Sequence, residues 1–146
     1  MLPCVDLLDV EIEWRPVPGW DGIEITRDRQ VRQIHDRVFE YEVATGSLPA
    51  KRVRKTIRAG VLTVFIWRSG KGRYKKEYHA VSANGKTVKV AVLMLLAWVG
   101  PKPFPKAVSR HLNDDSLDDR IENLAWGTQL ENMEDAERNR SWPYRK

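Results

Sequence analysis

The chain has a single cysteine, Cys4, among its 146 residues, and only three histidines. One cysteine excludes an internal disulfide and any CxxC zinc knuckle, and the histidines are too scattered for zinc-finger spacing. Internal repeats are absent, as are a phosphate-binding P-loop and the glycine fingerprint of dinucleotide-binding folds. The sequence therefore excludes a disulfide-stapled module and a zinc finger, and it gives no sign of a common nucleotide-binding fold.

Long hydrophobic runs are also missing. The longest one, residues 90–99, contains no charge but is far shorter than the ~20 residues that a membrane-spanning helix needs. Residues 1–14 are acidic rather than basic, which is not the pattern of a secretory signal. We therefore expect a reduced, cytoplasmic protein with no membrane partner, and the sequence indicates no protein partner. Its length suits one domain with a core, or a small domain with an extension.

Charge is distributed unevenly along the chain. The formal net charge of +5 and the pI of about 9.5 suggest an acidic partner such as nucleic acid. Residues 43–76 hold ten Lys or Arg and no Asp or Glu, whereas residues 111–137 hold nine acids and one base. A solvated polar face is the alternative, but the lack of acids favours salt-sensitive contact with double-stranded DNA. The expected DNA-contacting residues of this block are Lys51, Arg52, Arg54, Lys55, Arg58, Arg73, Lys75 and Lys76.

The middle of the chain has the pattern of a small antiparallel sheet region. Its β-branched and aromatic runs are typical of strands, and Asn84-Gly85 is the strongest short hairpin signal. Gly100-Pro101 marks the end of a helix, and residues 101–105 read as a stiff proline-rich connector. His79 is expected to be structural, and His35 to lie on an exposed surface. The predicted elements are strands at 61–67, 78–82 and 87–90 and a short buried helix at 91–98.

The most informative stretch is SRHLNDDSLDDRIENLAWGTQLEN, residues 109–132. Residues 107–112 and 122–126 are predicted strands, and the Asn-, Asp- and Ser-rich residues 113–119 form a loop between them. Thr128 and Glu131 have the spacing of a capping box, which starts a helix. The order is therefore strand, loop, strand, helix. Three polar residues are spaced along it: His111, Asn123 and Asn132.

This stretch resembles the HNH nuclease motif in its His-Asn-Asn form, as found in phage homing endonucleases. Around the three polar positions, the fit extends to Leu112, Leu117, Ile121, Glu122, Leu124, Trp126 and Thr128. The resemblance implies a ββα-metal unit, with His111 as the general base and Asn132 as a ligand of Mg²⁺ or Mn²⁺. It implies that Asn123 supports the site by hydrogen bonds. Histidine titrates near neutral pH and an amide oxygen suits a hard cation, so these residue types fit the chemistry.

The chain departs from the motif at two positions. The residue before the first histidine is usually an Asp or His that binds the metal, and here it is Arg110. Arginine has no acceptor and cannot ligate a cation, so Arg110 is expected to grip a phosphate instead. Asp114 stands where the turn usually has glycine, and Asp tolerates left-handed backbone better than most residues. Asp118 or Asp119 is the first candidate for an additional metal ligand.

The N-terminal part carries a second resemblance. Residues 13–22, EWRPVPGWDG, followed by IEITRDRQVR, are similar to the short module that often precedes HNH domains in homing endonucleases. Here the segment is one residue shorter, and Arg29 or Gln30 stands where glycine is usual. Ile23 and Ile25 alternate as in a half-buried strand. The two tryptophans of the segment, at positions 14 and 20, are expected to be core anchors.

The sequence thus predicts an α+β protein with a small antiparallel sheet region followed by a ββα-metal unit. Its expected segments are an N-terminal module at 1–50, a basic β-rich DNA-contacting region at 51–100 and the HNH unit at 101–146. The favoured function is a metal-dependent DNA endonuclease. The alternative is a DNA-binding protein on a degenerate HNH scaffold that has lost most cleavage. A third interpretation is RNA binding, because a basic sheet with aromatics can also stack single strands.

Overall fold

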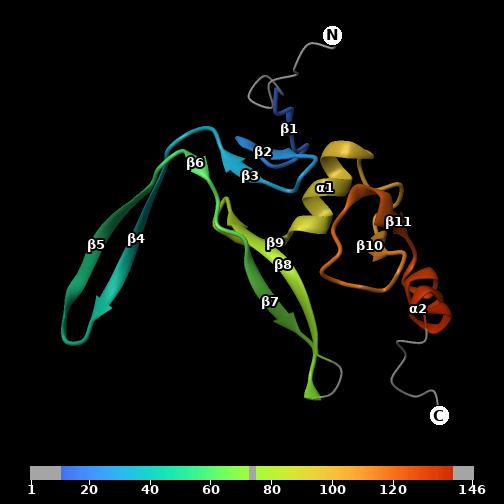
Figure 1. The fold of residues 1–146 in the computed structure, drawn as a ribbon. Coiled ribbons are helices and arrows are strands. Elements are labelled where there is room, and N and C mark those ends of the chain that lie inside the picture. The colour runs from blue at the N-terminus through green and yellow to red at the C-terminus, as the bar shows by residue number, and fades with distance from the viewer. Residues whose placement is uncertain (1–10, 73–74, 140–146) are drawn as a thin grey trace, which may run out of the picture.

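The structure, a computed structural model, describes residues 11–72 and 75–139. Within these ranges the chain is an α+β protein with four antiparallel sheets and two α-helices, which confirms the predicted class at this level. Figure 1 shows a body built around the helix α1, with a long two-stranded ribbon on one side and the unit that holds α2 on the other. No helix in the described ranges combines the length and the apolar character needed to cross a bilayer.

A small N-terminal sheet forms one side of the body. Its strands are β1 (Trp14–Pro16), β2 (Ile23–Thr26), β3 (Val31–Gln33) and β6 (Gly60–Val61), in that order. Ile23 and Ile25 are buried, as the alternation predicts. Both tryptophans are partly buried, but only Trp20 packs against the core as expected. The Cζ atom of Arg32 lies 4.2 Å from the centre of the Trp14 ring. Of Arg29 and Gln30, the two residues that stand where the related module usually has glycine, Arg29 adopts the left-handed backbone, with a φ of 69°.

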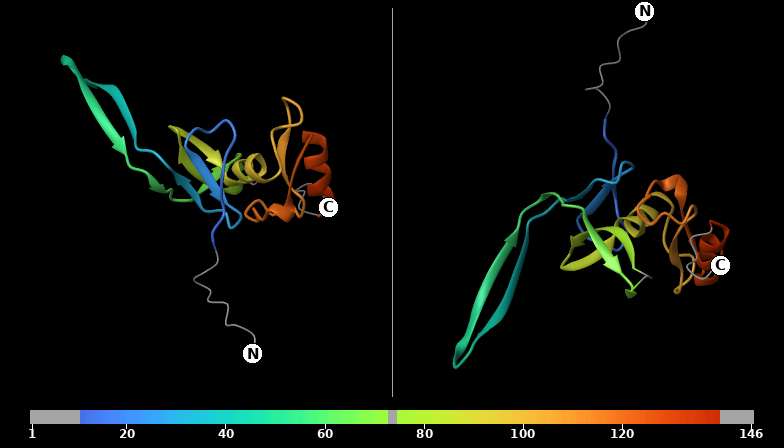
Figure 2. Two further views of the ribbon diagram at one scale, coloured as in Figure 1. Left: turned by 90° about the horizontal axis from the view of Figure 1, so that it is seen from above. Right: turned by 60° about the horizontal axis from the view of Figure 1, so that its bottom comes forward.

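The next two strands form a ribbon that leaves the body. β4 (Arg37–Thr45) and β5 (Leu48–Ile57) pair only with each other, in a sheet of two strands. Figures 1 and 2 show the ribbon extending away from every other element. The expected segment boundary between residues 50 and 51 falls within β5, so both sides of it belong to one hairpin. The division into three functional segments remains a prediction.

A three-stranded sheet forms the other side of the body. β7 (Phe65–Ser69), β8 (Lys76–Ala83) and β9 (Lys86–Lys89) lie in that order. Asn84 and Gly85 both have positive φ, at 53° and 75°, which confirms the predicted hairpin turn. The prediction of one strand at 61–67 is wrong, because β6 pairs with β3 whereas β7 pairs with β8. Residues 62–64 carry the chain from one sheet to the other.

The helix α1 (Val90–Trp98) lies between these sheets and the C-terminal unit. It contacts strands of all three, and Leu93, Met94 and Leu95 are fully buried. Such burial explains why the segment is apolar on every side, since a helix that is hydrophobic all round needs cover all round. The backbone N–H of Gly100 donates to the carbonyl of Leu95 at 2.8 Å, so the helix ends at the predicted Gly-Pro stop.

The C-terminal unit has the predicted order of strand, loop, strand and helix. β10 (Val108–His111) pairs antiparallel with β11 (Leu124–Gly127). A 3₁₀ turn, η3 (Ile121–Asn123), replaces the start of the strand predicted at 122–126, because the chain turns there from the loop into β11. Helix α2 (Gln129–Arg138) follows, and the predicted capping box between Thr128 and Glu131 is present in both directions, at 2.7 and 3.1 Å.

Candidate active site

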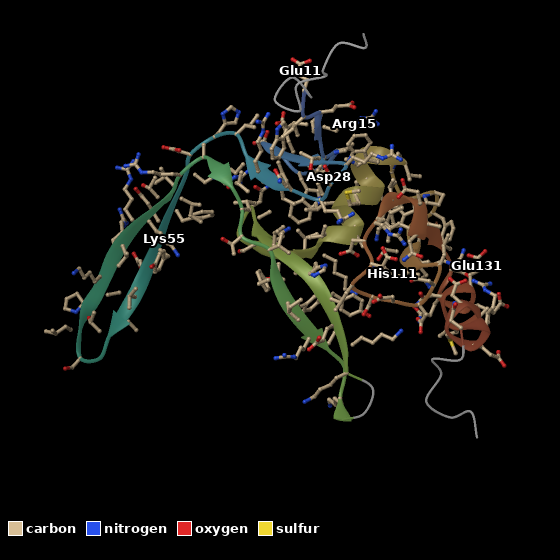
Figure 3. The ribbon with its side chains drawn as sticks, in the orientation of Figure 1. Glu11, Arg15, Asp28, Lys55, His111 and Glu131 are labelled. Atoms are coloured by element: carbon tan, nitrogen blue, oxygen red, sulfur yellow. The ribbon has the colours of Figure 1, made fainter. Side chains whose placement is uncertain are left out.

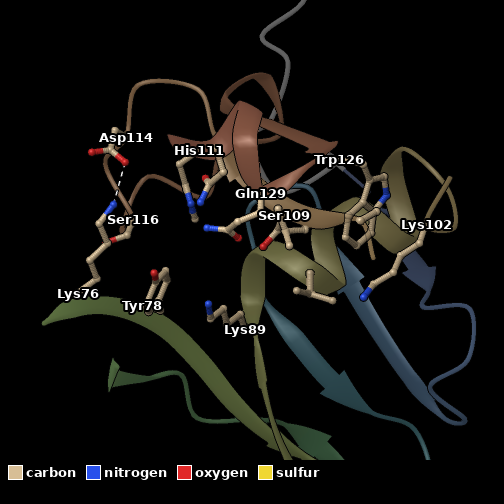
Figure 4. Close-up of a pocket in the computed structure, with 14 residues that line it drawn as sticks. Lys76, Tyr78, Lys89, Lys102, Ser109, His111, Asp114, Ser116, Trp126 and Gln129 are labelled. Carbon is tan, nitrogen blue, oxygen red and sulfur yellow. Dashed lines mark hydrogen bonds and ion pairs between the residues drawn. The ribbon is translucent and has the colours of Figure 1, made fainter. Parts of the chain in front are cut away.

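A pocket of about 390 Å³ lies where β8, α1, β10 and α2 meet. Two of the three motif residues, His111 and Asn132, line it. Figure 4 shows His111 on one side of this pocket, with Tyr78 of β8 and Lys89 of β9 across from it. The further polar and charged lining residues are Lys76, Lys102, Ser109, Asp114, Ser116 and Gln129. The pocket is therefore rich in cations and hydrogen-bonding groups.

His111 is held by a buried carboxylate. Its Nε2 lies 2.7 Å from Oδ1 of Asp119, and both residues are buried. The second oxygen of Asp119 lies 3.2 Å from Nδ1 of His79, which comes from β8. When Asp119 is ionised it only accepts, so Nε2 of His111 carries the proton and Nδ1 presents a lone pair. Nδ1 of His111 has no hydrogen-bond partner among the described residues, so it is the nitrogen that can take a proton.

Asn123 supports the loop that contains this carboxylate. Its side-chain oxygen accepts the backbone N–H of Asn113 at 3.0 Å. Its amide donates to the side chain of Asn113 at 2.9 Å and to the carbonyl of Asp118 at 2.8 Å. Asn123 is buried and does not line the pocket, so its contacts are those of a residue that shapes the loop. This geometry agrees with the hydrogen-bonding role that the resemblance implies.

The loop itself is held by its own polar side chains. Asp118 accepts two hydrogen bonds from the Arg120 guanidinium, which hold the pKa of that carboxyl well below its usual range. Asp114 adopts a φ of 57°, the left-handed conformation for which glycine is usual at this position of the motif. It also pairs with Lys76 at 2.8 Å, which ties the loop to β8. Asp118 therefore faces Arg120, while Asp119 faces the two histidines.

Arg110 points away from the pocket. Its Nε donates to Oδ2 of Asp135 at 2.8 Å and a terminal nitrogen donates to Oδ1 at 3.0 Å. These hydrogen bonds raise the pKa of Arg110 and, despite burial, lower the pKa of Asp135. The side chain crosses β11 at Gly127, where an added Cβ would collide with Arg110 and Glu131. The expected grip of Arg110 on a phosphate beside His111 is thus not favoured by its placement, because its guanidinium joins β10 to α2.

Lys89 and Tyr78 lie together in the wall of the pocket. Lys89 lies with its Nζ 3.7 Å from the centre of the Tyr78 ring, and burial followed by repulsion from Lys76 lowers its pKa. Burial raises the pKa of the Tyr78 phenol, with Lys76 opposing that shift. The Tyr78 and His111 ring centres are 6.4 Å apart. A site with positive charge and a neutral phenol beside a histidine is suited to an anionic substrate such as a phosphodiester.

The donor set for a metal is sparse. Within residues 11–72 and 75–139, no group of three or more His, Cys, Asp and Glu side chains converges as a cation would require. The oxygen donors that line the pocket with Asn132 are neutral, except for Asp114, which is paired with Lys76. Asp119, the other candidate ligand, has both oxygens directed at imidazoles. The described residues therefore do not fit a divalent cation held by the protein alone.

The remaining predicted DNA contacts lie in two places. Figure 3 shows Lys55 on the ribbon, far along the molecule from His111. Lys51, Arg52 and Arg54 are also exposed on β5, and Arg58 is exposed where the ribbon rejoins the body. Lys75 is exposed next to Lys76 at the pocket, whereas Arg73 lies outside the described residues. The basic block is thus split between the ribbon and the start of β8.

The contact between His79 and Asp119 is a feature of the site that the sequence did not predict. His79 was expected to be structural, and it reaches Asp119 from a strand 40 positions earlier in the chain. His35 is exposed, as expected. Comparison with family models, with curated proteins and with solved structures finds no match to this chain. A functional assignment therefore rests on the residues and geometry of the pocket and on the motif resemblance.

Proposed function

We propose that the chain is a DNA endonuclease that hydrolyses phosphodiester bonds on an HNH-type ββα-metal unit formed by β10, β11 and α2. The observation that carries the proposal is the contact between His111 and Asp119 at the edge of a cationic pocket. A buried carboxylate that orients an imidazole toward a substrate pocket is an arrangement suited to general-base catalysis. Asn132 lines the same pocket from the first turn of α2.

In this proposal, His111 removes a proton from the attacking water. Nδ1 accepts the proton while Nε2–H stays bonded to Asp119, which stabilises the resulting imidazolium. The hydroxide attacks phosphorus, the bond to the leaving sugar oxygen breaks, and that oxygen takes a proton from solvent. His79 holds the second oxygen of Asp119, so the carboxylate has less freedom to rotate away from His111.

The lysines of the pocket provide positive charge for the phosphate. Lys76 and Lys89 extend from β8 and β9, and Lys102 comes from the connector after α1. Charge fixed around the phosphoryl oxygens lowers the barrier most when it faces the charge that develops in the transition state. The neutral phenol of Tyr78 beside Lys89 adds a hydrogen-bond donor without adding negative charge.

The resemblance also implies Mg²⁺ or Mn²⁺, and Asn132 is the residue of the chain proposed to touch it. Because residues 11–72 and 75–139 hold no cluster of metal ligands, we expect a cation to bind only weakly until DNA supplies phosphate oxygens. Magnesium keeps several waters and often uses few protein ligands, which is compatible with such shared binding. Isothermal titration of Mg²⁺ or Mn²⁺ with and without duplex DNA tests this order. Tight binding by the free protein would contradict it.

A plasmid-nicking assay with Mg²⁺, with Mn²⁺ and with EDTA tests the proposal. We expect the parent protein to nick DNA with a cation and to stop in EDTA. His111→Ala should keep duplex binding but lose about 10²–10⁴-fold in rate, the usual contribution of a general base. Nicking by His111→Ala at the parent rate would overturn the assignment of the base.

Arg110 favours a second candidate, a DNA-binding protein on a degenerate HNH scaffold. Arg110 occupies the sequence position at which the motif usually has a metal ligand, and its guanidinium is bonded to Asp135 of α2. In Arg110→Asp a carboxylate, the ligand type that the motif usually has at this position, replaces the guanidinium. This candidate expects duplex binding without nicking in the parent, and gain of Mn²⁺ binding and of nicking in Arg110→Asp. The endonuclease proposal expects nicking by the parent.

A further inference from the structure

The ribbon is the largest element that the proposed active site does not use. Nearly all residues of β4 and β5 are exposed, and Figure 2 shows the ribbon extending alone in two further views. An isolated pair of strands is only marginally stable in water, because it has no core of its own. An exposed ribbon of this length is therefore an element that gains stability by binding a partner.

The register of the ribbon separates its side chains into two chemically different faces. Successive residues of a strand point to opposite sides, and residues paired across the strands share a side. Lys51 pairs with Val43 and Lys55 pairs with Phe39, while Val53 pairs with Tyr41 between them. We call this side the lysine face. It consists of Phe39, Tyr41, Val43, Lys51, Val53 and Lys55.

The opposite side, which we call the arginine face, holds Arg52 and Arg54 across from Glu42 and Glu40. Arg52 and Glu42 form an ion pair at 3.9 Å, and Glu40 is the direct cross-strand partner of Arg54. Two acids and two bases leave this face neutral. The lysine face carries two cations and no acid. The acid-free stretch of residues 43–76 therefore gives a surface without acids on this side of the ribbon only, because Glu40 and Glu42 of β4 lie on the other side.

We infer that the lysine face binds duplex DNA in the major groove. The inference deepens the proposed function, on which it rests for DNA as the partner. Two strands about 4.8 Å apart form a ribbon that fits a groove about 12 Å wide. Lysine donates to O6 and N7 of guanine, and apolar side chains such as Val53 contact the thymine methyl group. The lysine face thus has chemistry that complements base edges, as well as charge that complements phosphates.

Where the ribbon joins the body, a contact shows which side of the ribbon carries the lysine face. Phe39 belongs to the lysine face, and its Cε1 lies 3.7 Å from the position of a Cβ added at Gly85 in the β8–β9 turn. The lysine face therefore begins on the side of the ribbon turned toward the body. A duplex held on it lies on that same side and adds a binding surface separate from the pocket of His111 (Figure 3).

Two double variants with the same loss of charge test the assignment of the face. Lys51→Gln with Lys55→Gln and Arg52→Gln with Arg54→Gln each remove two cations from exposed positions of β5. Fluorescence anisotropy with a mixed-sequence duplex at several salt concentrations gives affinity and its salt dependence. We expect the lysine pair to weaken binding roughly tenfold or more and to reduce the log–log salt slope by up to about 1.8, the value for two lost phosphate contacts. The arginine pair should change both quantities little.

A third experiment tests whether the lysine face binds in the major or the minor groove of the duplex. Duplexes with a bulky substituent at C5 of cytosine block the major groove, and a minor-groove ligand such as netropsin blocks the other. Binding should fall with the first and persist with the second, and the lysine pair should remove that difference. Equal effects of the two double variants, or loss with netropsin only, would overturn the inference.

These outcomes are distinguishable from failure of the proposed function. A parent that binds DNA through the lysine face but never nicks it refutes the endonuclease and leaves the ribbon assignment intact. A parent that nicks DNA while both double variants bind alike refutes only the ribbon assignment. A parent that binds no duplex at any salt concentration refutes both.

Discussion

Nε2 of His111 and Oδ1 of Asp119 lie 2.7 Å apart, and the same carboxylate holds His79 with its other oxygen. An acceptor at this place determines which nitrogen of His111 carries the proton. The orientation of the proposed base therefore depends on a residue that stands eight positions away in the loop and is itself buried.

Asp119→Asn should lower the nicking rate by about 10²–10⁴-fold while duplex affinity stays near that of the parent. The amide offers an N–H toward Nε2, which favours the tautomer with the proton on Nδ1 and removes the lone pair that accepts from water. Single-turnover nicking and anisotropy measure the two quantities. Nitrogen chemical shifts of the His111 ring should show the change of tautomer even without activity.

Asp28→Asn is the matched control, because Asp28 is an exposed aspartate in the N-terminal turn, far from the pocket (Figure 3). It should leave the rate and the ring shifts unchanged. If Asp119→Asn leaves the ring nitrogens of His111 as they are in the parent, the carboxylate does not set the tautomer.

Gly127→Ala should lower the free energy of unfolding by about 1–3 kcal/mol, the usual cost of an added carbon in a packed site. The new Cβ collides with the Arg110 side chain and with the Glu131 carboxylate of the capping box. Urea denaturation gives the change. In an Arg110→Ala background the same substitution should cost less, since one of the colliding groups is gone. Equal costs in both backgrounds would show that Arg110 does not press on Gly127.

Asp135 should make stability depend on pH in the acid range. Hydrogen bonds from Arg110, opposed by burial and helped by Arg138, lower the pKa of Asp135 in the folded protein. The stabilisation that ionised Asp135 gives to the folded protein is therefore complete above the pKa of an aspartate in the unfolded chain, about 3.9. It is lost as the pH falls through the pKa of Asp135 in the folded protein. Asp135→Asn should cost about 2–3 kcal/mol at neutral pH, because it removes the carboxylate that is hydrogen-bonded to Arg110 and leaves that cation only its ion pair with Glu131 at 3.6 Å.

The same variant should show a flatter loss of stability on acidification than the parent. Urea denaturation at a series of pH values measures both curves, with Glu134→Gln on the exposed side of α2 as the control. Parallel curves for the parent and Asp135→Asn would contradict the linkage.

Duplex affinity should fall in alkaline solution before exposed lysines titrate. Burial, with repulsion from Lys76, lowers the pKa of Lys89, so this cation loses its charge below the ordinary lysine value of about 10.4. The raised pKa of Tyr78 keeps its phenol neutral over that interval. Lys89→Arg should keep affinity nearly constant over the same interval, because arginine stays charged. A parallel decline in the parent and Lys89→Arg would assign the effect to another group.

Local signals predicted the parts of the fold that depend on neighbouring residues. The Asn84-Gly85 turn, the Thr128–Glu131 capping box and the stop at Gly100 each need contacts within a few positions, and each is present. Left-handed backbone at Asp114 likewise follows from one position in a turn. Such features are readable because the sequence places both partners side by side.

Features that join distant segments could not be read in this way. His79 meets Asp119 across 40 positions, and Arg110 meets Asp135 across 25. The acids that neutralise one face of the basic block lie on β4, outside the acid-free stretch, and only the strand register brings Glu40 and Glu42 opposite the arginines. Residues 61–67 have the composition of one strand, but competition between two sheets divides them. In each case the decisive partner is brought into place by strand pairing or tertiary packing between segments that are distant in the sequence.

The ribbon also determines what a common optical probe can report. The chain has six tryptophans, and none of them lies within residues 37–57. The tryptophans within the described residues all lie outside the ribbon, so their emission during a thermal or urea melt follows the body around α1 and does not respond when β4 and β5 fray. Tyr41 is the only aromatic fluorophore on the outer ribbon that such fraying releases. A protein judged intact by its tryptophan signal can thus already have lost its ordered ribbon, and amide exchange is the measurement that separates the two events.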